Sequence, residues 1–311
     1  MSRALQAATL IYNPKAGRRQ HAQVIEGIKA ALSTTYDLKV APTHAPKEAT
    51  TLARDAAVRG DAAVFAWGGD GTIREVVEGI LGSPVMLGVL PGGTFNVVAL
   101  AVGLPNRPVE AARALATARP CPRDVGLIES TAFLMQATAG LDAFIMDHLR
   151  PEMKARFGQA AVLLDGLRAF PRYRFEPFDV DVDGQVHSVT GAAFVNMSEY
   201  AGRYQYVPGA RWDDGRAHVV LYSGRTHLQA LMFTLGIASG RHHLMKDVLI
   251  KEATTMTILP SKTAHIQTDG DPWKGSFTRD LSALDAADSG SDPRRQIERA
   301  AARLPFQARA E

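Results

Sequence analysis

Cysteine is almost absent from this chain. Its 311 residues include one, Cys121, so no internal disulfide can form and a disulfide-framework domain is excluded. No motif typical of a reactive thiol surrounds Cys121, and we interpret it as buried or incidental. The chain therefore needs another source of stability, and its length provides one: 311 residues predict two domains, each with its own core.

Long apolar runs are also missing. No stretch reaches the roughly 18 residues of a transmembrane helix. The most apolar segment, Leu228 to Ser239, is too short to span a membrane and is interpreted as a core helix. Residues Met1 to Gln6 are too short and too polar for a signal peptide. Together these features predict a cytoplasmic protein.

Positive charge is in only slight excess over negative charge. The formal net charge is +3, with 22% charged and 46% apolar residues, which is ordinary for a globular protein. This excess is too weak to predict nucleic-acid binding. It is compatible with transient, peripheral contact with an anionic membrane surface. The sequence is silent on the oligomeric state.

The first third of the chain alternates short apolar runs with segments of helical periodicity. Strands that lack polar alternation and are each followed by a helix predict a parallel sheet covered on both faces. The expected strands are 8–12, 38–41, 62–67 and 85–90, and the expected helices are 20–32, 46–59, 73–81 and a stretch ending near 102. We assign residues 1–123 to this α/β nucleotide-binding domain.

After about residue 124 the pattern changes to alternating strands. Residues 178–184 alternate and end in Asp183-Gly184, a tight hairpin signal. Further strands are expected at 192–196, 218–222 and 255–259, with helices at 153–170 and 226–239. These features predict a β-rich antiparallel domain over 124–284. Residues 285–311 are predicted to be a polar tail, in which 293–304 could alternatively form a basic amphipathic helix that contacts a membrane or partner.

Three loops rich in glycine and proline follow strands of the predicted parallel sheet, at the edge where such sheets bind ligands. Gly68-Gly69-Asp70-Gly71-Thr72 opens a helix, so its backbone N–H groups suit a phosphate. A carboxylate at Asp70 makes sense there if Mg²⁺ or a ligand hydroxyl is also present. The other two loops are Asn13-Pro14-Lys15-Ala16-Gly17 and Pro91-Gly92-Gly93-Thr94-Phe95-Asn96. The Gly68 and Pro91 loops could instead be capped turns, with Thr94 as the N-cap of a helix, and Lys15 of the first loop could simply be solvated.

Together these loops resemble those of the diacylglycerol kinase catalytic domain family, which includes sphingosine kinases and bacterial lipid kinases. The resemblance extends to residues 139–143, to 204–215 with its Asp213-Asp214-Gly215 turn, and to Thr268-Asp269-Gly270-Asp271. It implies an α/β nucleotide domain, like that of NAD kinases and diacylglycerol kinases, followed by a C-terminal antiparallel β-sandwich. It also implies transfer of the ATP γ-phosphate to a lipid hydroxyl, with the lipid entering between the domains.

The resemblance further implies roles for individual residues. Asp271 would be the general base, and Asp70 would organise Mg²⁺ and the phosphates. A second, structural Mg²⁺ would be bound by the Asp214 side chain and the backbone carbonyls of Arg211 and Arg216. Nucleotide contacts are implied for Asn13, Pro14, Lys15, Thr43, Gly68, Gly69, Gly71, Thr72, Gly93, Thr94 and Asn96.

The chain departs from the family pattern in three places. Asp271 replaces a glutamate, which shortens the side chain by one methylene, so Asp269 could share its role. Val97 stands where many members carry aspartate. No closing strand is recognisable after Phe277.

Two alternatives to a lipid kinase follow from these features. One is a nucleotide- or lipid-binding module with little or no turnover. The other is an NAD kinase, which shares the Gly-Gly-Asp-Gly-Thr loop. It is disfavoured because this chain has the Asn-Pro loop and the Asp-Asp-Gly turn, which NAD kinases lack. NAD kinases also carry an Asn-Glu pair in their second domain, and this chain has no Asn-Glu dipeptide.

Overall fold

The computed structural model describes residues 4–14, 21–128, 131–149, 159–200, 204–259, 264–273, 279–282 and 304–306. The chain divides into two compact units. The N-terminal unit comprises residues 1–124 together with 290–311, and the C-terminal unit comprises residues 125–289. No helix in the described part of the chain is long and apolar enough to cross a membrane.

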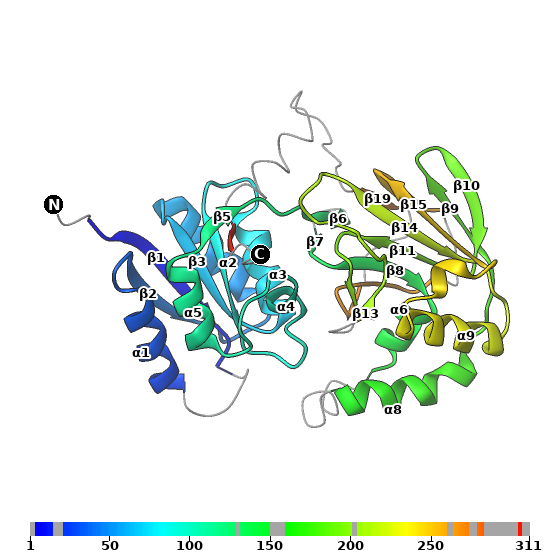
Figure 1. The fold of residues 1–311 in the computed structure, drawn as a ribbon, viewed down its shortest axis with the longest axis horizontal. Coiled ribbons are helices and arrows are strands. Elements are labelled where there is room, and N and C mark those ends of the chain that lie inside the picture. Colours follow the sequence, from blue (N-terminus) through cyan, green and yellow to red (C-terminus); the bar gives the residue numbers. More distant parts are fainter. Residues whose placement is uncertain are drawn as a thin grey trace. The chain divides into compact units, whose positions relative to one another are not determined.

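A four-stranded parallel sheet forms the centre of the N-terminal unit (Figure 1). Its strand order is β2-β1-β3-β4, and the pairing of β1 with both β2 and β3 places β1 in the interior of the sheet. The strands are β1 (Gln6–Tyr12), β2 (Tyr36–Pro42), β3 (Ala63–Gly68) and β4 (Met86–Pro91). Every residue of β3 is buried, as its unbroken apolar sequence predicts.

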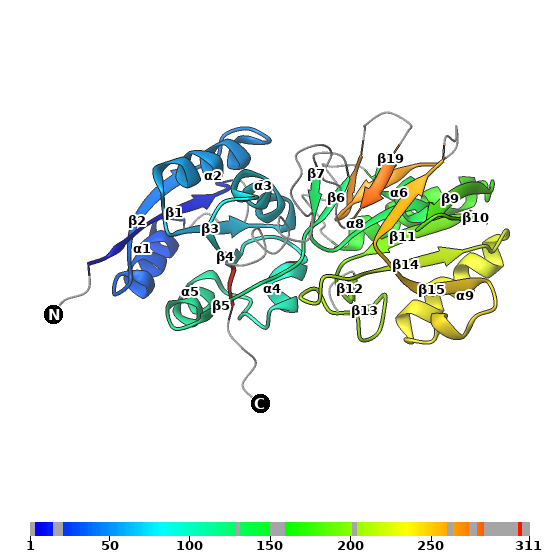
Figure 2. The ribbon, with the colours of Figure 1, turned by 90° about the horizontal axis from the view of Figure 1, so that it is seen from above.

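Helices cover both faces of this sheet, with α1 and α5 on one face and α2 and α3 on the other (Figure 2). The helices are α1 (His21–Leu32), α2 (Glu48–Arg59), α3 (Asp70–Ile80), α4 (Val97–Ala101) and α5 (Pro108–Ala116). A Cβ on Gly79 would collide with the Thr50 carbonyl oxygen, so glycine permits the close approach of α3 to α2. This layered arrangement confirms the predicted α/β fold.

A short strand pair joins distant parts of the N-terminal unit. Strand β5 (Arg119–Cys121) pairs antiparallel with β20 (Leu304–Phe306). Residues 304–306, which belong to the predicted polar tail, thus form a strand that the sequence analysis did not predict. Three residues are too few to show a periodicity, and β5 lies far away in the sequence. The alternative helix over 293–304 falls almost wholly outside the described residues.

Two six-stranded sheets form the C-terminal unit. Their orders are β10-β9-β16-β19-β6-β7 and β15-β14-β11-β8-β17-β18, and all neighbours are antiparallel. The first sheet contains β6 (Gly126–Ile128), β7 (Thr131–Phe133), β9 (Phe178–Val182), β10 (Gln185–Val189), β16 (Thr255–Ile258) and β19 (Arg279–Ser282). The second contains β8 (Gln136–Gly140), β11 (Gly191–Val195), β14 (Ala217–Tyr222), β15 (Val248–Ala253), β17 (Ile266–Thr268) and β18 (Asp271–Pro272). Strand β19 is the closing strand that the sequence did not reveal.

Buried side chains from both sheets form one hydrophobic core, which confirms the predicted β-sandwich. Phe133 and Phe194 meet there edge to face at 6.2 Å. Strand β11 alternates, so Phe194 faces this core while Ala193 and Val195 face a second cluster on the other side of the sheet. The remaining elements of this unit are α6 (Leu141–Asp147), α8 (Gln159–Ala169), η1 (Phe170–Arg172), β12 (Glu199–Tyr200), β13 (Tyr204–Gln205), α9 (His227–Ala238) and η2 (His242–Leu244).

The hairpin between β9 and β10 has the turn that its sequence predicts. Asp183 and Gly184 both have positive φ, 51° and 84°, which suits a two-residue hairpin turn. The Asp183 carboxylate also accepts hydrogen bonds from the backbone N–H groups of Thr254 (3.2 Å) and Thr255 (2.9 Å). The turn is thereby fixed to the start of β16.

Candidate active site

The predicted nucleotide loops lie at the carboxyl ends of the four parallel strands. Backbone hydrogen bonds join them: Asn13 N–H donates to Trp67 (3.3 Å) and Thr43 N–H to Tyr12 (2.9 Å). Gly92 N–H donates to the Gly68 carbonyl oxygen at 2.8 Å. The register of the sheet thus brings four separate segments to one edge, where ligands of open α/β sheets bind.

The glycines allow the second and third loops to touch through their backbones. A Cβ on Gly93 would lie 2.5 Å from the Gly69 Cα, and a Cβ on Gly92 would lie 3.0 Å from Trp67 Nε1. A Cβ on Gly68 would lie 2.6 Å from the Thr72 side chain. The contacts below 3.0 Å are too close for real side chains, so this edge requires glycine at positions 68 and 93, and a side chain at position 92 would be tight. Backbone that is bare in this way can approach a phosphate closely.

Helix α3 begins at the second loop. The first intrahelical bonds run from the N–H groups of Thr72 (2.9 Å) and Ile73 (3.1 Å) to the Gly69 carbonyl oxygen. The N–H groups of the first turn consequently point beyond the helix end, where the helix dipole favours an anion. Asp70 Oδ1 accepts a hydrogen bond from Val98 N–H at 3.1 Å, which links this loop to the first turn of α4.

Asn96 shapes the third loop from within. Its side chain is 5% exposed, and its Oδ1 accepts from Gly93 N–H at 2.7 Å. Its Nδ2 donates to the Gly93 carbonyl (3.1 Å) and to Asn106 Oδ1 (2.8 Å). Asn96 also has a positive φ of 50° and immediately precedes α4, so Thr94 is not the N-cap. Thr94 is exposed beside Gly93.

Nearly all the residues with implied nucleotide contacts therefore gather at this sheet edge. The exception is Lys15, which lies outside the described residues, as do residues 16 and 17. The gathered residues are Asn13, Pro14, Thr43, Gly68, Gly69, Gly71, Thr72, Gly93, Thr94 and Asn96.

Asp271, the predicted general base, follows a tight turn between β17 and β18. The turn residues Asp269 and Gly270 have φ of 50° and 84°. The Asp269 carboxylate accepts three backbone N–H groups, from Leu134 (2.7 Å), Met135 (2.9 Å) and Gln136 (3.1 Å). Asp269 is therefore an anchor that holds the turn against the start of β8, which argues against a share in proton transfer.

A polar network that sequence reasoning missed supports the same turn. The side chain of Gln267, 1% exposed, accepts from Gly270 N–H (2.6 Å) and donates to Thr138 Oγ1 (2.8 Å) and Asp142 Oδ2 (2.8 Å). Tyr200 donates its hydroxyl to Asp142 Oδ1 at 3.1 Å. Burial and the nearby Asp142 charge raise the pKa of Tyr200 well above its ordinary value, so Tyr200 remains a donor. The alternation of Gln136 and Thr138 with small apolar residues in β8 is the signal that could have revealed polar side chains on this face.

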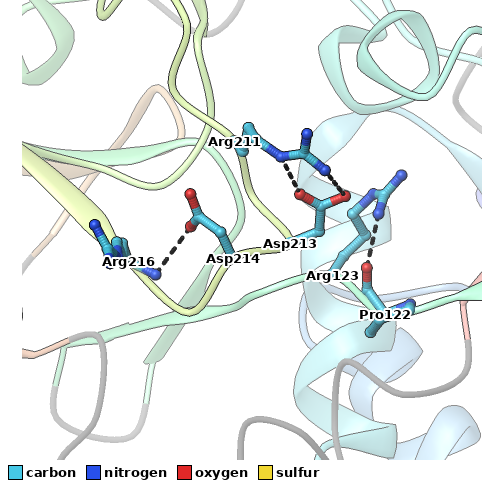
Figure 3. Close-up of polar contacts among 6 residues, drawn as sticks. All are labelled: Pro122, Arg123, Arg211, Asp213, Asp214 and Arg216. Carbon is cyan, nitrogen blue, oxygen red and sulfur yellow. Dashed lines mark hydrogen bonds and ion pairs between the residues drawn. The ribbon is translucent and has the colours of Figure 1, made fainter.

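The predicted structural metal site lies in the loop before β14 (Figure 3). The Arg211 guanidinium contacts the Asp213 carboxylate through two bonds, at 2.9 and 3.3 Å, which raise the pKa of Arg211. Asp214 is exposed, and its Oδ1 accepts from Arg216 N–H at 3.0 Å. One carboxylate and two carbonyls suit a largely hydrated Mg²⁺, which takes oxygen ligands and keeps several waters. No group of three or more His, Cys, Asp or Glu side chains that could hold a metal occurs within the described ranges.

Comparisons with known proteins agree with this geometry. The family model for the diacylglycerol kinase catalytic domain matches residues 7–128. The model for the YegS C-terminal NAD kinase beta sandwich-like domain matches residues 136–278. The two matches together span both units.

Relatives of similar length are found in bacteria. A Bacillus subtilis protein named "Diacylglycerol kinase" is 26% identical over 276 residues, which cover 86% of this chain and 90% of the relative. A Pseudomonas aeruginosa protein named "Probable lipid kinase YegS-like" is 28% identical, covering 87% of this chain and 89% of the relative. A crystal structure of a diacylglycerol kinase from Bacillus anthracis shares the fold, with a TM-score of 0.72 at 23% identity, covering 90% of this chain and 94% of that one. This chain belongs to the diacylglycerol kinase catalytic domain family of lipid kinases.

Proposed function

We propose that this protein transfers the γ-phosphate of ATP to a hydroxyl group of a lipid such as diacylglycerol. The observation that carries the proposal is the meeting of the glycine loops at one sheet edge. There Gly92 N–H binds the Gly68 carbonyl oxygen and Gly93 touches Gly69. Bare backbone beside the N-terminus of α3 suits a polyphosphate. The lipid acceptor is supported by the family, since relatives over nearly the whole chain are named as lipid kinases.

In the proposed reaction the lipid hydroxyl oxygen forms a bond to the γ-phosphorus. The bond between that phosphorus and the β,γ-bridging oxygen breaks, and ADP leaves with the electron pair. The proton of the lipid hydroxyl passes to the Asp271 carboxylate. Such reactions depend mainly on positioning and charge stabilisation. The loop N–H groups would neutralise phosphate charge, and the turn fixed by Asp269 and Gln267 would hold Asp271 in place.

The residues at the phosphate-binding loops are compatible with Mg²⁺, which usually binds through one or two carboxylates together with substrate phosphates. Asp70 would supply that carboxylate while its Oδ1 keeps the hydrogen bond from Val98 N–H. When bound, Mg²⁺ would reduce the negative charge on the phosphates. We propose that Asp214 and the carbonyls of Arg211 and Arg216 hold a second ion with a structural task.

The test is incubation of the full-length protein with γ-labelled ATP, Mg²⁺ and a panel of acceptors. The panel contains diacylglycerol, sphingosine and phosphatidylglycerol in mixed micelles, with NAD as the non-lipid acceptor. Labelled phosphate in an extracted lipid is the expected result, and omission of Mg²⁺ should abolish it.

Other outcomes separate the alternatives. ATP binding without any labelled product would replace the kinase with a binding module. Label in NAD alone would identify an NAD kinase. A matched Asp271→Asn variant shows whether any labelling comes from this protein and not from a contaminating kinase.

A further inference from the structure

Helix α9 (His227–Ala238) carries an apolar face that none of the segments described by the structure covers. Leu228, Leu231, Met232 and Leu235 are 65%, 47%, 48% and 52% exposed. They stand at positions i, i+3, i+4 and i+7, so they form one stripe along the helix. Sequence analysis interpreted this segment as a core helix, and the structure corrects that interpretation for half of its surface.

The opposite face of α9 explains why the helix is apolar all round. Ala230 and Ile237 are buried, and Phe233 packs with Ile237 on the outer side of the second sheet. Phe233 also stacks on Tyr222 at 4.6 Å. The helix is thus fixed to the sandwich by one face, and the exposed stripe is presented on a rigid support. A contiguous exposed apolar stripe of this kind is a sign of an interaction surface.

The charged side chains that flank the stripe are mainly positive, although the Asp247 carboxylate also lies beside α9, where it accepts a hydrogen bond from Gln229 Nε2 at 2.8 Å. No Asp or Glu occurs between Arg216 and Lys246. Arg225 precedes α9, and Arg241 and Lys246 follow it; all three are exposed. Across the described residues, none of these three side chains takes part in an ion pair. Leu244, the last residue of η2, is 73% exposed and adds a further apolar side chain three positions after Arg241.

From this combination we infer that the α9 stripe and its flanking cations dock the protein on the surface of an anionic lipid bilayer. The leucines and Met232 enter the boundary between headgroups and acyl chains, as in helices that lie in the interface plane. Arg225, Arg241 and Lys246 remain at headgroup level, where each basic residue is attracted by anionic lipids. The contact fits the proposed action on lipids but does not depend on it.

A second copy of this chain is a poorer occupant of the same surface. Pairing two α9 stripes would bring together Arg225, Arg241 and Lys246 of both copies, and the Asp247 carboxylate beside α9 is too little negative charge to neutralise them. Like charges brought together at an interface disfavour the complex. An anionic bilayer neutralises the same cations, so charge complementarity selects the membrane.

The test is sedimentation of the full-length protein, without ATP, with vesicles of equal parts phosphatidylglycerol and phosphatidylcholine. Wild type should bind them in a salt-dependent way and bind phosphatidylcholine vesicles more weakly. The triple variant Leu231→Gln, Met232→Gln, Leu235→Gln should lower the partition coefficient by about tenfold or more, because three apolar side chains no longer leave water. The matched control is Val58→Gln, which alters an 83% exposed valine on α2 and should bind like wild type.

Two further measurements keep the outcome decisive. Arg241→Gln with Lys246→Gln should weaken binding to the anionic vesicles only, and this variant or Leu231→Gln alone replaces the triple variant if that one unfolds. Unchanged binding in all these variants, or no binding by wild type, would overturn the inference. So would a dimer in light scattering that the Leu231→Gln variant abolishes while vesicle binding persists. Since ATP is absent, failure here leaves the kinase proposal standing, and failure of the kinase assay leaves this result intact.

Discussion

Asp70, the first residue of α3, accepts a hydrogen bond from Val98 N–H at 3.1 Å and thereby joins two of the glycine loops. Val98 belongs to the first turn of α4, so the Asp70 carboxylate acts as a cap for a helix other than its own. The family resemblance of the sequence implies that Asp70 organises Mg²⁺ and the phosphates. The structure adds the capping of α4 as a second role, and two substitutions at Asp70 can separate the two roles.

Asp70→Asn should abolish phosphate transfer while leaving the fold intact. The asparagine Oδ1 can still accept from Val98 N–H, but the charge that would attract Mg²⁺ is gone. Asp70→Ala should also abolish transfer, and should lower the free energy of unfolding by about 1 kcal/mol because the cap is lost. Labelled-lipid assays and urea denaturation measure the two effects. Wild-type turnover by Asp70→Asn would show that the negative charge is not required.

Gly93→Ala should disrupt nucleotide binding. The new Cβ would lie 2.5 Å from the Gly69 Cα, so the second and third loops must separate. We expect the Kd for ATP, measured by calorimetry, to rise at least about tenfold, since small displacements at such sites are costly. Gly166→Ala is the matched control: it adds a Cβ to helix α8, at an ordinary distance of 3.6 Å from the Ile145 side chain, and should leave ATP binding unchanged. Equal Kd values for the two variants would contradict the proposal that the bare backbone of the glycine loops binds the phosphates of ATP.

Much of the N-terminal unit could be predicted because its signals are local. A fully apolar strand followed by Gly68-Gly69-Asp70-Gly71-Thr72 indicates a buried strand, a loop and a helix in direct succession, as observed over residues 63–80. The register of a parallel sheet then brings the loops to one edge without further information. The Asp183-Gly184 turn was predicted in the same way, from residues that tolerate positive φ.

The features that escaped prediction depend on contacts between distant residues. Asp269 binds backbone groups that precede it by more than 130 positions, and Gln267 reaches Asp142 across a similar separation. No periodicity records such pairings. Strand β19 escaped for the same reason, since its partners lie on β16 and β6. The exposed stripe of α9 escaped because an apolar sequence shows hydrophobicity but not which face a sheet will cover.

Asp271→Asn should reduce phosphate transfer strongly, by about 100-fold or more, because an amide cannot accept the hydroxyl proton. Its Kd for ATP should stay near that of wild type, since the phosphate-binding loops belong to the other unit. Asp271→Glu restores the family's usual residue and should retain transfer. Measured kcat values and ATP titrations for the three proteins decide the point. Full turnover by the asparagine variant would mean that Asp271 is not the base.

Asp271→Asn is expected to lower phosphate transfer, whereas Asp269→Asn should act chiefly on the stability of the fold. Its carboxylate accepts three backbone N–H groups, and an amide would place its own NH₂ against at least one of them. We expect the free energy of unfolding to fall by about 1–3 kcal/mol, with Asp179→Asn, at an exposed position of β9, nearly neutral. Urea denaturation followed by fluorescence compares the two. Equal stability of both variants would remove the anchoring role of Asp269.

The Asp183 hairpin anchor should make part of the stability sensitive to acid. Partial burial alone would raise the pKa of Asp183, but hydrogen bonds from Thr254 and Thr255 prevail and hold it below its ordinary 3.8. A lowered pKa in the folded state means that the unfolded chain binds the proton more readily. The stabilisation is therefore complete above about pH 4 and is lost as the pH falls through the folded-state pKa.

Asp183→Asn tests this dependence while keeping a residue that tolerates the positive φ at this position. The variant should be less stable than wild type at pH 7, and the difference should shrink as the pH is lowered below 3.8. Urea midpoints measured between neutral and acid pH give the comparison. Asp179→Asn, which alters an exposed carboxylate on the preceding strand β9, is the control and should follow wild type throughout. A difference that widens in acid would reverse the sign of the effect and exclude Asp183 as the anchor.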